Sequence, residues 1–171
     1  AIPVPPQAPA FEGYADTAPV KLWYWDTGGE GEVVVLNHPW SQGSACWKYQ
    51  QPAFAAAGYR VIAWSRRGAY KTERGPLDNL GTSASDQKAL LDFLGIEKCH
   101  MIGAAAGGVT SLNFALENPE RLHSLILSGT VLLPDEEDWK AMRSRIGLPR
   151  GHGASPTYQE IGPSYRGGNP D

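Results

Sequence analysis

The sequence predicts an α/β fold: a mostly parallel, twisted sheet with helices on both of its faces. Short aliphatic runs such as VVVL at 33–36 are typical of strands that are buried on both sides. Stretches of helical period alternate with these runs, and glycines such as Gly58 and Gly95 stand where the helices should end. Strands that alternate with helices form parallel sheets through right-handed crossovers.

The composition is that of one ordinary globular domain. The chain has 171 residues, 42% of them apolar, and a formal net charge of −3. It contains no run of like charge, and no stretch approaches the ~18 apolar residues that span a bilayer. We therefore expect a soluble protein with a small-molecule substrate, and neither a nucleic-acid nor a membrane partner.

The composition also divides the chain into three segments. Residues 1–10 are rich in proline and predict an extended arm, which would fit a mature chain whose export signal has been removed or simply an arbitrary starting point. Residues 11–130 carry the alternating pattern of the core. Residues 131–171 have one short helical piece and then many glycines, prolines and aromatics, so we expect a lid or cap segment there.

The first half of the core should contain four strands and one helix. The predicted strands lie at 11–20, 20–26, 33–36 and 59–64, and the predicted helix at 44–57. Trp47 and Phe54 are the large apolar contacts of that helix. Pro52 should kink the helix or restart it at a first-turn position.

The second half should contain two further helix–strand units. The predicted helices lie at 82–95 and within 108–122, where Asn118-Pro119 should end the second one, and the predicted strands lie at 98–103 and 123–129. Ser83 and Asp86 have the spacing of a capping box for the first of these helices. Its buried stripe should be Leu90, Leu91 and Leu94, and the second helix places Val109, Leu112 and Leu116 on one face.

The glycine-rich turn in GAAAGG, residues 103–108, admits three interpretations. A phosphate-binding loop would need lysine where Val109 stands, and a dinucleotide turn would need glycine where Ala105 stands. The third interpretation is a nucleophile elbow, G-x-S-x-G, in which Gly103 and Gly107 allow a tight strand-to-helix turn. Ala105 then occupies the nucleophile position, and the following helix offers free N–H groups to an oxyanion.

Several ordered motifs resemble the N-terminal part of an α/β-hydrolase over residues 11–130. VVVLNHPW resembles the strand and oxyanion loop, and GYRVIAWSRRGAYKTE resembles the stretch that often reads GYRVIAPDxRGxGxS. SLNFALENPERLHSLILSG is similar to the post-elbow segment of hydrolases that cleave C–C bonds in ring-fission products. The chain departs from the family pattern at Pro39, Ser65, Tyr70 and, above all, Ala105.

The resemblance implies a set of site residues. Ala105 holds the nucleophile position, the backbone N–H groups of Trp40 and Ala106 form the oxyanion hole, and the residues expected to line the substrate pocket are His38, Ser41, Val131 and Leu132. His38 fits a scaffold of the oxyanion loop better than a general base. For Ser44 we expect loop capping, and for Arg67 a brace of the loop after its strand, with an anionic substrate group as the alternative partner.

The family triad continues with an acid and then a histidine, in that chain order. The resemblance places both beyond this chain, so we expect a C-terminal fragment or second chain to supply Asp and His and to cover the exposed edge of the strand at 123–129. Such a break would fall in the lid. His100 and His123 should be structural, and the role of His152 stays open.

Alanine cannot attack a carbonyl, so two origins stay open for Ala105: a serine-to-alanine change made to trap a substrate, or a natural branch that lost its nucleophile. The leading hypothesis is a hydrolase of a small, partly apolar ester, lactone, amide or C–C bond substrate. The alternatives are a His–Asp lyase, cyclase or oxygenase on the same fold, and a ligand-binding pseudo-hydrolase. We predict no cofactor and no metal site, and two buried thiols at Cys46 and Cys99.

Overall fold

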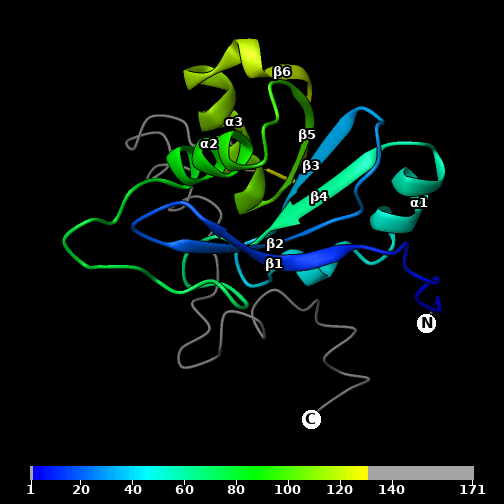
Figure 1. The fold of residues 1–171 in the computed structure, drawn as a ribbon, viewed down its shortest axis with the longest axis horizontal. Helices are drawn as coiled ribbons and strands as arrows, with labels where there is room; N and C mark the ends of the chain where they lie inside the picture. The colour runs from blue at the N-terminus through cyan, green and yellow to red at the C-terminus, as the bar shows by residue number, and fades with distance from the viewer. Residues whose placement is uncertain (1, 131–171) are drawn as a thin grey trace, which may run out of the picture. The chain divides into compact units, whose positions relative to one another are not determined.

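The computed structural model describes residues 2–130, which belong to the first of the two units of the chain, Ala1–Val131 (Figure 1). Its strands are β1 (Phe11–Asp16), β2 (Lys21–Asp26), β3 (Val33–Asn37), β4 (Arg60–Trp64), β5 (Cys99–Ala104) and β6 (Leu122–Ser128). Its helices are the 3₁₀ helices η1 (Ser44–Trp47) and η2 (Pro119–Arg121) and the α-helices α1 (Gln50–Ala56), α2 (Ser83–Phe93) and α3 (Ala106–Glu117). The predicted lid, residues 131–171, lies outside the described part.

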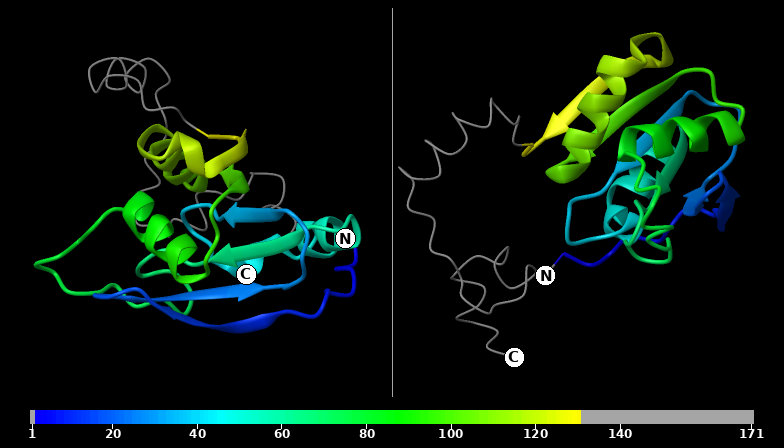
Figure 2. Two further views of the ribbon diagram at one scale, coloured as in Figure 1. Left: turned by 45° about the horizontal axis from the view of Figure 1, so that its top comes forward. Right: turned by 90° about the vertical axis from the view of Figure 1, so that its left-hand side faces the viewer.

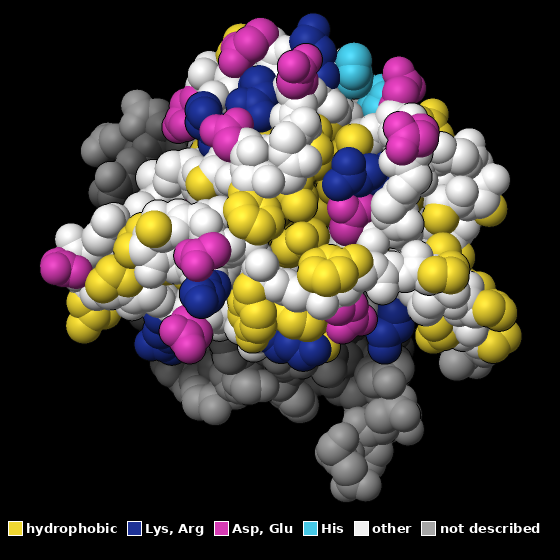
Figure 3. Space-filling model, in the orientation of Figure 1, with side chains coloured by type: hydrophobic (Ala, Val, Ile, Leu, Met, Phe, Trp, Pro, Cys, Tyr) yellow, Lys and Arg dark blue, Asp and Glu magenta, His cyan; other side chains and the backbone are white. Residues whose placement is uncertain are grey.

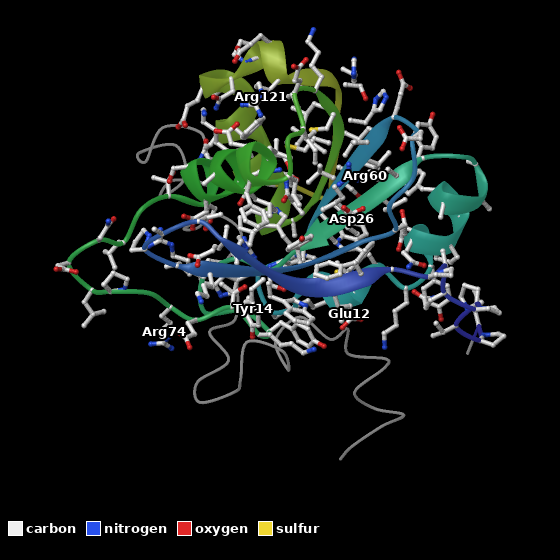
Figure 4. All side chains as sticks on the ribbon, viewed as in Figure 1. Glu12, Tyr14, Asp26, Arg60, Arg74 and Arg121 are labelled. Atoms are coloured by element: carbon white, nitrogen blue, oxygen red, sulfur yellow. The ribbon has the colours of Figure 1, made fainter. Side chains whose placement is uncertain are left out.

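The strands form one sheet in the order β1-β2-β4-β3-β5-β6. β3, β4, β5 and β6 run parallel to one another, whereas β1 pairs antiparallel with β2 and β2 pairs antiparallel with β4. The mostly parallel sheet is therefore confirmed. Arg60 fastens β4 to β2, because its guanidinium donates to both carboxylate oxygens of Asp26 at 2.6–3.1 Å (Figure 4).

Helices cover both faces of the sheet, as predicted, and each face has its own core. Successive residues of β3 and β4 point to opposite faces, which is why their aliphatic runs lack alternation. One core contains Val35 and Ile62 together with Leu90 and Leu91 of α2 and Phe114 of α3. α2 and α3 lie side by side (Figures 1 and 2).

The other core lies on the opposite face, under η1 and α1. It contains Val34 and Leu36 of β3, and Trp47 of η1 is buried in it. Phe54 of α1 packs against this cluster, so both large apolar contacts expected of the helix at 44–57 are present. The helix itself is broken in two, and Pro52 falls in the first turn of α1, where its missing N–H has no helical partner to lose.

The predicted capping box of α2 is wrong by one residue. Thr82 is the N-cap: its hydroxyl accepts from the Ser85 backbone N–H at 3.0 Å, and the Ser85 hydroxyl accepts from the Thr82 N–H at 3.1 Å. Ser83 is already helical. Asp86, the other member of the predicted box, faces Arg67 instead, because a buried guanidinium partner outweighs a local cap.

The buried face of α3 also differs from the apolar stripe in the sequence. Gly107, Gly108, Thr110, Ser111 and Phe114 are buried, whereas Leu116 is 74% exposed. Small residues face the sheet because the helix begins directly against the strand ends. The stripe of Val109, Leu112 and Leu116 thus points away from the described core.

Candidate active site

A strained turn joins β5 to α3. β5 ends at Ala104, α3 begins at Ala106, and Ala105 between them has φ 49° and ψ −117°, a left-handed conformation that L-residues rarely adopt. The Ala105 N–H donates to the Ser128 carbonyl of β6 at 2.9 Å, and the Gly108 N–H donates to the Ala105 carbonyl at 3.0 Å. The turn is therefore fixed on both sides of its tip, and the tip is exposed.

Neither of the two glycines that flank this turn has room for a side chain. A Cβ on Gly107 would lie 2.1 Å from the Asn37 carbonyl oxygen and 2.7 Å from that of His38. A Cβ on Gly103 would lie 2.5 Å from the Gly107 oxygen. These contacts are with backbone atoms, which cannot move aside. The expected reason for both glycines is confirmed, and the end of β3 lies directly against the start of α3.

A buried polar network supports the turn from below, and the sequence analysis missed it. Asn37, at the end of β3, donates from Nδ2 to Ser111 Oγ at 2.7 Å and to Gln87 Oε1 at 3.1 Å, and its Oδ1 accepts from Trp64 Nε1 at 2.6 Å. Ser111 Oγ in turn donates to the Gly107 carbonyl at 2.9 Å. The sequence does contain a signal for this network, because an asparagine directly after a buried aliphatic run must find hydrogen-bond partners.

His38 and Arg66 hold the loop that follows β3. The Arg66 backbone N–H donates to His38 Nε2 at 3.1 Å, so the ring proton sits on Nδ1, which donates to the Pro39 carbonyl at 2.7 Å. The Arg66 guanidinium donates to the same carbonyl at 2.9 Å and lies 5.6 Å from the centre of the Trp40 ring. Arg66 is thus a brace that the sequence analysis did not identify.

His38 is kept neutral by these surroundings. Burial, and to a smaller extent the positive charge of Arg66, lowers the pKa of His38 from 6.5 to about 4. Burial likewise lowers the pKa of Arg66. With both ring nitrogens engaged, His38 acts as a scaffold of the loop, in line with its expected role.

The remaining site residues lie along the same loop or outside the described range. Trp40 is 72% exposed and Ser41 is partly exposed. Ser44 is buried, its backbone N–H donating to Ser65 Oγ at 3.1 Å and its hydroxyl accepting from the same Oγ at 3.0 Å. Ser44 therefore ties the loop to the end of β4, which agrees with a capping role. The predicted pocket residues Val131 and Leu132 lie outside the described residues.

Arg67 is a structural brace. Its guanidinium makes a bidentate pair with Asp86 at 2.7 and 2.8 Å, and it donates to the Asn79 carbonyl at 2.7 Å. The guanidinium therefore contacts both α2 and the loop before it. The structural interpretation of Arg67 is therefore favoured over the gripping of an anionic group.

His100 and His123 lie at the opposite end of the sheet from the turn. His100 is near the start of β5, with Nδ1 2.8 Å from Ser124 Oγ and Nε2 3.3 Å from Glu32 Oε2. The His123 ring lies 5.2 Å from it. Since β5 carries Ala105 at its other end, neither histidine can serve that position, as expected.

One face of the described part carries charges of both signs. Basic and acidic side chains are mixed over the face that Figure 3 shows.

Within residues 2–130 no group of three or more histidine, cysteine, aspartate or glutamate side chains could hold a metal ion. None of the helices in this range has the length and hydropathy to cross a membrane. Cys99 is buried, as predicted, whereas Cys46 is only partly buried. Burial raises the pKa of Cys46 to about 11 and that of Cys99 to about 12, so both thiols are protonated at neutral pH.

Comparison with known sequences gives a family and a set of relatives. The family profile described as alpha/beta hydrolase fold matches residues 32–148, more than half of the chain. A 2-hydroxy-6-oxo-6-phenylhexa-2,4-dienoate hydrolase of Comamonas testosteroni is 40% identical over 113 residues, covering 63% of this chain and 40% of the relative. A 2-hydroxy-6-oxononadienedioate/2-hydroxy-6-oxononatrienedioate hydrolase of the same organism is 42% identical over 106 residues, covering 59% and 37%. The chain thus spans about two fifths of the length of these relatives.

Solved structures show the same fold. A carboxylesterase structure from the ammonia-oxidizing Thaumarchaeon Nitrososphaera gargenis superposes with a TM-score of 0.65 at 27% identity, covering 84% of this chain and 54% of that one. An epoxide hydrolase of Vigna radiata superposes with a TM-score of 0.69 over 81% of this chain and 46% of that one. The identity to the second structure is 24%, so this likeness concerns the fold alone.

Proposed function

The chain belongs to the α/β hydrolase fold family, and from this premise we propose that it is part of a hydrolase of a small, partly apolar substrate, with position 105 as the site of attack. The observation that carries the proposal is the backbone of Ala105. A strained residue at the tip of a strand-to-helix turn, with no room for side chains on either side, presents its own side chain outward over the strand ends.

The chemistry expected of such a turn is acyl transfer through a nucleophile at its tip. A hydroxyl at position 105 would attack a carbonyl, and the oxyanion formed would accept hydrogen bonds from the backbone N–H groups of Ala106 and Trp40. In support of this assignment, the start of α3 packs directly against the carbonyls of Asn37 and His38, which lead into the loop that carries Trp40. Each such donor contributes about 3 kcal/mol to a working site.

The names of two relatives support a narrower proposal for the substrate. Two of them are hydrolases of 2-hydroxy-6-oxo-dienoates, and the identity to both is about 40%. We accordingly propose a C–C bond between a carbonyl carbon and its neighbour as the first candidate for cleavage. Esters, lactones and amides are the next candidates, because their hydrolysis also begins with attack on a carbonyl.

The chemistry also needs a general base, and we propose that a further polypeptide segment supplies an Asp and a His. Within residues 2–130, His100 and His123 lie at the wrong end of the sheet, and both ring nitrogens of His38 are engaged. The same segment would pair with β6, whose far edge has no strand beside it among the described residues.

Ala105 itself favours a second candidate, a ligand-binding protein or a nucleophile-independent enzyme on the same fold. Without a hydroxyl at this position no acyl intermediate can form. A base of the His–Asp type would still permit proton abstraction from a bound substrate. The two candidates differ in their response to restoring the hydroxyl.

Ala105→Ser in the full-length protein distinguishes the candidates. We expect hydrolysis of p-nitrophenyl acetate and of a 2-hydroxy-6-oxo-dienoate to rise by at least about a hundredfold over the parent, the scale of a restored nucleophile. The matched control is Ala104→Ser, which places the same hydroxyl one residue before the tip, on the strand. Steady-state kinetics of both variants and the parent give the comparison.

Three outcomes would contradict the hydrolase proposal. Equal gains in both variants would show that the hydroxyl reacts without the turn. No gain in a folded Ala105→Ser protein would favour ligand binding, and turnover of a substrate by the parent that stays unchanged in the variant would favour a nucleophile-independent enzyme.

A further inference from the structure

Three donors converge on the carbonyl of Pro39, in the loop after β3. Arg66 Nη2 lies 2.9 Å from the carbonyl oxygen, and His38 Nδ1 lies 2.7 Å from it. The Gln42 N–H lies 3.5 Å from the same oxygen and closes a wide turn over residues 39–42. The direction of this carbonyl is therefore fixed both from its own loop and from the segment after β4.

A fixed carbonyl also fixes the N–H at the other end of the same peptide unit. The peptide bond between Pro39 and Trp40 is trans and planar, so its N–H points away from its C=O. The Trp40 N–H is accordingly directed to the side of the loop opposite the Arg66 guanidinium. Within residues 2–130 no acceptor forms a hydrogen bond with this N–H, so no described group competes with a ligand for it.

The other donor expected in the oxyanion hole is fixed by the same part of the backbone. Ala106 is the first residue of α3, where the N–H groups lack partners inside the helix, and no side chain caps this helix. The next residue, Gly107, packs against the carbonyl of His38, one residue before Pro39. The loop and the start of α3 are thus held together close to both donors.

Arg66 supplies a charge in addition to a hydrogen bond. Its guanidinium is charged at neutral pH, and no carboxylate of the described range pairs with it. Its Cζ lies 5.6 Å from the centre of the exposed Trp40 ring. A hydrogen bond from a cation to a carbonyl is stronger than a neutral one and polarises the peptide, which makes the N–H at the other end a better donor.

We propose that Arg66 is a positioning residue for the hydrolysis proposed above, on which this role rests: by donating to the Pro39 carbonyl, Arg66 aims and polarises the Trp40 N–H toward the oxyanion. A residue that only braces the loop affects stability. A positioning residue also affects how well the oxyanion is bound. Position 66 is unspecified in the pattern GYRVIAPDxRGxGxS, so the family resemblance gives Arg66 no role.

The test uses Ala105→Ser in the full-length protein, with and without Arg66→Met, and phenyl trifluoromethyl ketone as the probe. The introduced oxygen bonds to the ketone carbon, the electron pair of the C=O double bond moves to the ketone oxygen, and the hydroxyl proton passes to the base. The adduct thus carries an oxyanion where the reaction would form one. Fluorine NMR detects the adduct, and inhibition of p-nitrophenyl acetate hydrolysis gives its affinity.

Methionine keeps an apolar stem beside Trp40 and removes the charge and the donors. We expect Arg66→Met to weaken the adduct and to lower kcat in parallel, each by about tenfold or more, which is part of the loss caused by removing an oxyanion-hole donor. KM should change by less than about twofold. Arg66→Lys keeps the charge and a donor, so it should recover most of the loss.

Arg74→Met is the matched control, because it removes the same charge from an exposed residue of the loop after β4 (Figure 4). No ion pair joins Arg74 to another residue of the described range. This variant should change neither the affinity of the adduct nor kcat. If Arg66→Met does not fold, as judged by urea unfolding, Arg66→Gln replaces it, because its shorter and uncharged amide cannot polarise the carbonyl.

A second measurement needs no activity. The amide nitrogen of Trp40 is bonded to the carbonyl carbon of Pro39, so its NMR chemical shift reports hydrogen bonds to that carbonyl. In the parent protein, Arg66→Met should move this resonance and Arg74→Met should leave it in place.

Three results would overturn the role of Arg66 and leave the hydrolase proposal standing. They are an adduct as tight in the folded Arg66→Met variant as without it, equal losses in Arg66→Met and Arg74→Met, and an unchanged Trp40 amide resonance. Absence of both adduct and turnover in Ala105→Ser itself would instead contradict the proposed function, and the positioning role with it.

Discussion

At the residue scale, the backbone of Ala105 is held in a strained conformation. A non-glycine residue in such a conformation costs about 1–3 kcal/mol, and the surrounding structure must impose it. Here the imposing contacts are known: Gly103 and Gly107 are packed against backbone, and the Ala105 N–H is held by Ser128. An alanine side chain has no function that requires this geometry, so the strain supports our proposal that position 105 is the site of attack.

His38 makes the stability of the protein depend on pH. Its pKa is about 4 in the folded state against 6.5 ordinarily, so between these values the unfolded chain binds more protons. The free energy of unfolding should therefore be highest above pH 6.5 and fall by up to about 3 kcal/mol as the pH drops to 4. Urea unfolding at pH 7, 5.5 and 4.5 measures this.

His38→Gln is the control for that pH dependence. Glutamine retains an acceptor for the Arg66 N–H but does not titrate, so the part of the slope due to residue 38 should disappear between pH 4 and 6.5. A variant with the same slope as the parent in this window would refute the assignment. A variant that is less stable at every pH would not refute the assignment, because the imidazole also contributes packing contacts in the loop.

At the element scale, the N-terminal arm is part of the fold rather than a loose tail. The sequence analysis expected an extended arm at residues 1–10, and the structure adds what holds residues 2–10: the amide of Gln51 pairs with both backbone groups of Ala8, as a neighbouring strand would. Gln51 lies in the first turn of α1, just after η1, so the break between these helices brings it to the arm.

Gln51→Ala should release the arm. Loss of the two hydrogen bonds to Ala8 is expected to lower the free energy of unfolding by about 1–2 kcal/mol and to speed hydrogen exchange of the Ala8 amide by about tenfold or more. Gln50→Ala, on an exposed neighbour, is the matched control and should change neither quantity. Unchanged Ala8 exchange in Gln51→Ala would mean that other contacts hold the arm.

At the scale of the whole molecule, the two edges of the sheet differ within residues 2–130. β1 ends the sheet on one side, where the arm and the loop carrying Tyr70 accompany it. On the other side β6 pairs only with β5 among the described residues, and Ile126 is 53% exposed. The outward stripe of α3, with Leu116, lies on the element that packs beside β6. An apolar, unpaired edge favours association.

Expressed alone, the 171-residue chain should self-associate through β6. Ile126→Lys places a charge on this strand and should weaken the association by about tenfold or more, measured by analytical ultracentrifugation. Phe93→Lys is the control, because it removes a similarly exposed apolar side chain from α2, away from the edge. Equal effects of both variants, or a monomeric parent, would contradict the role of β6.

Local patterns in the sequence were enough to predict the elements and the turn. Aliphatic runs, helical periodicity and glycines depend on near neighbours, so all six strands, α2 and α3 lie where they were predicted, and Gly103 and Gly107 flank the tip at Ala105. The fold class follows from the same patterns, because alternating strands and helices leave few topologies open.

Only the tertiary structure decided which of several chemically similar residues performs each task. Arg66 braces the loop of His38 through the Pro39 carbonyl, 27 residues away, and Asp86 pairs with Arg67, 19 residues away, instead of capping α2, so both outcomes depend on partners that are distant in the chain. The partners of Asn37 lie 27 to 74 residues away. The sequence by itself thus determined the fold and the place of the strand-to-helix turn at Ala105, whereas the contacts that hold this turn arise from burial and distance in three dimensions.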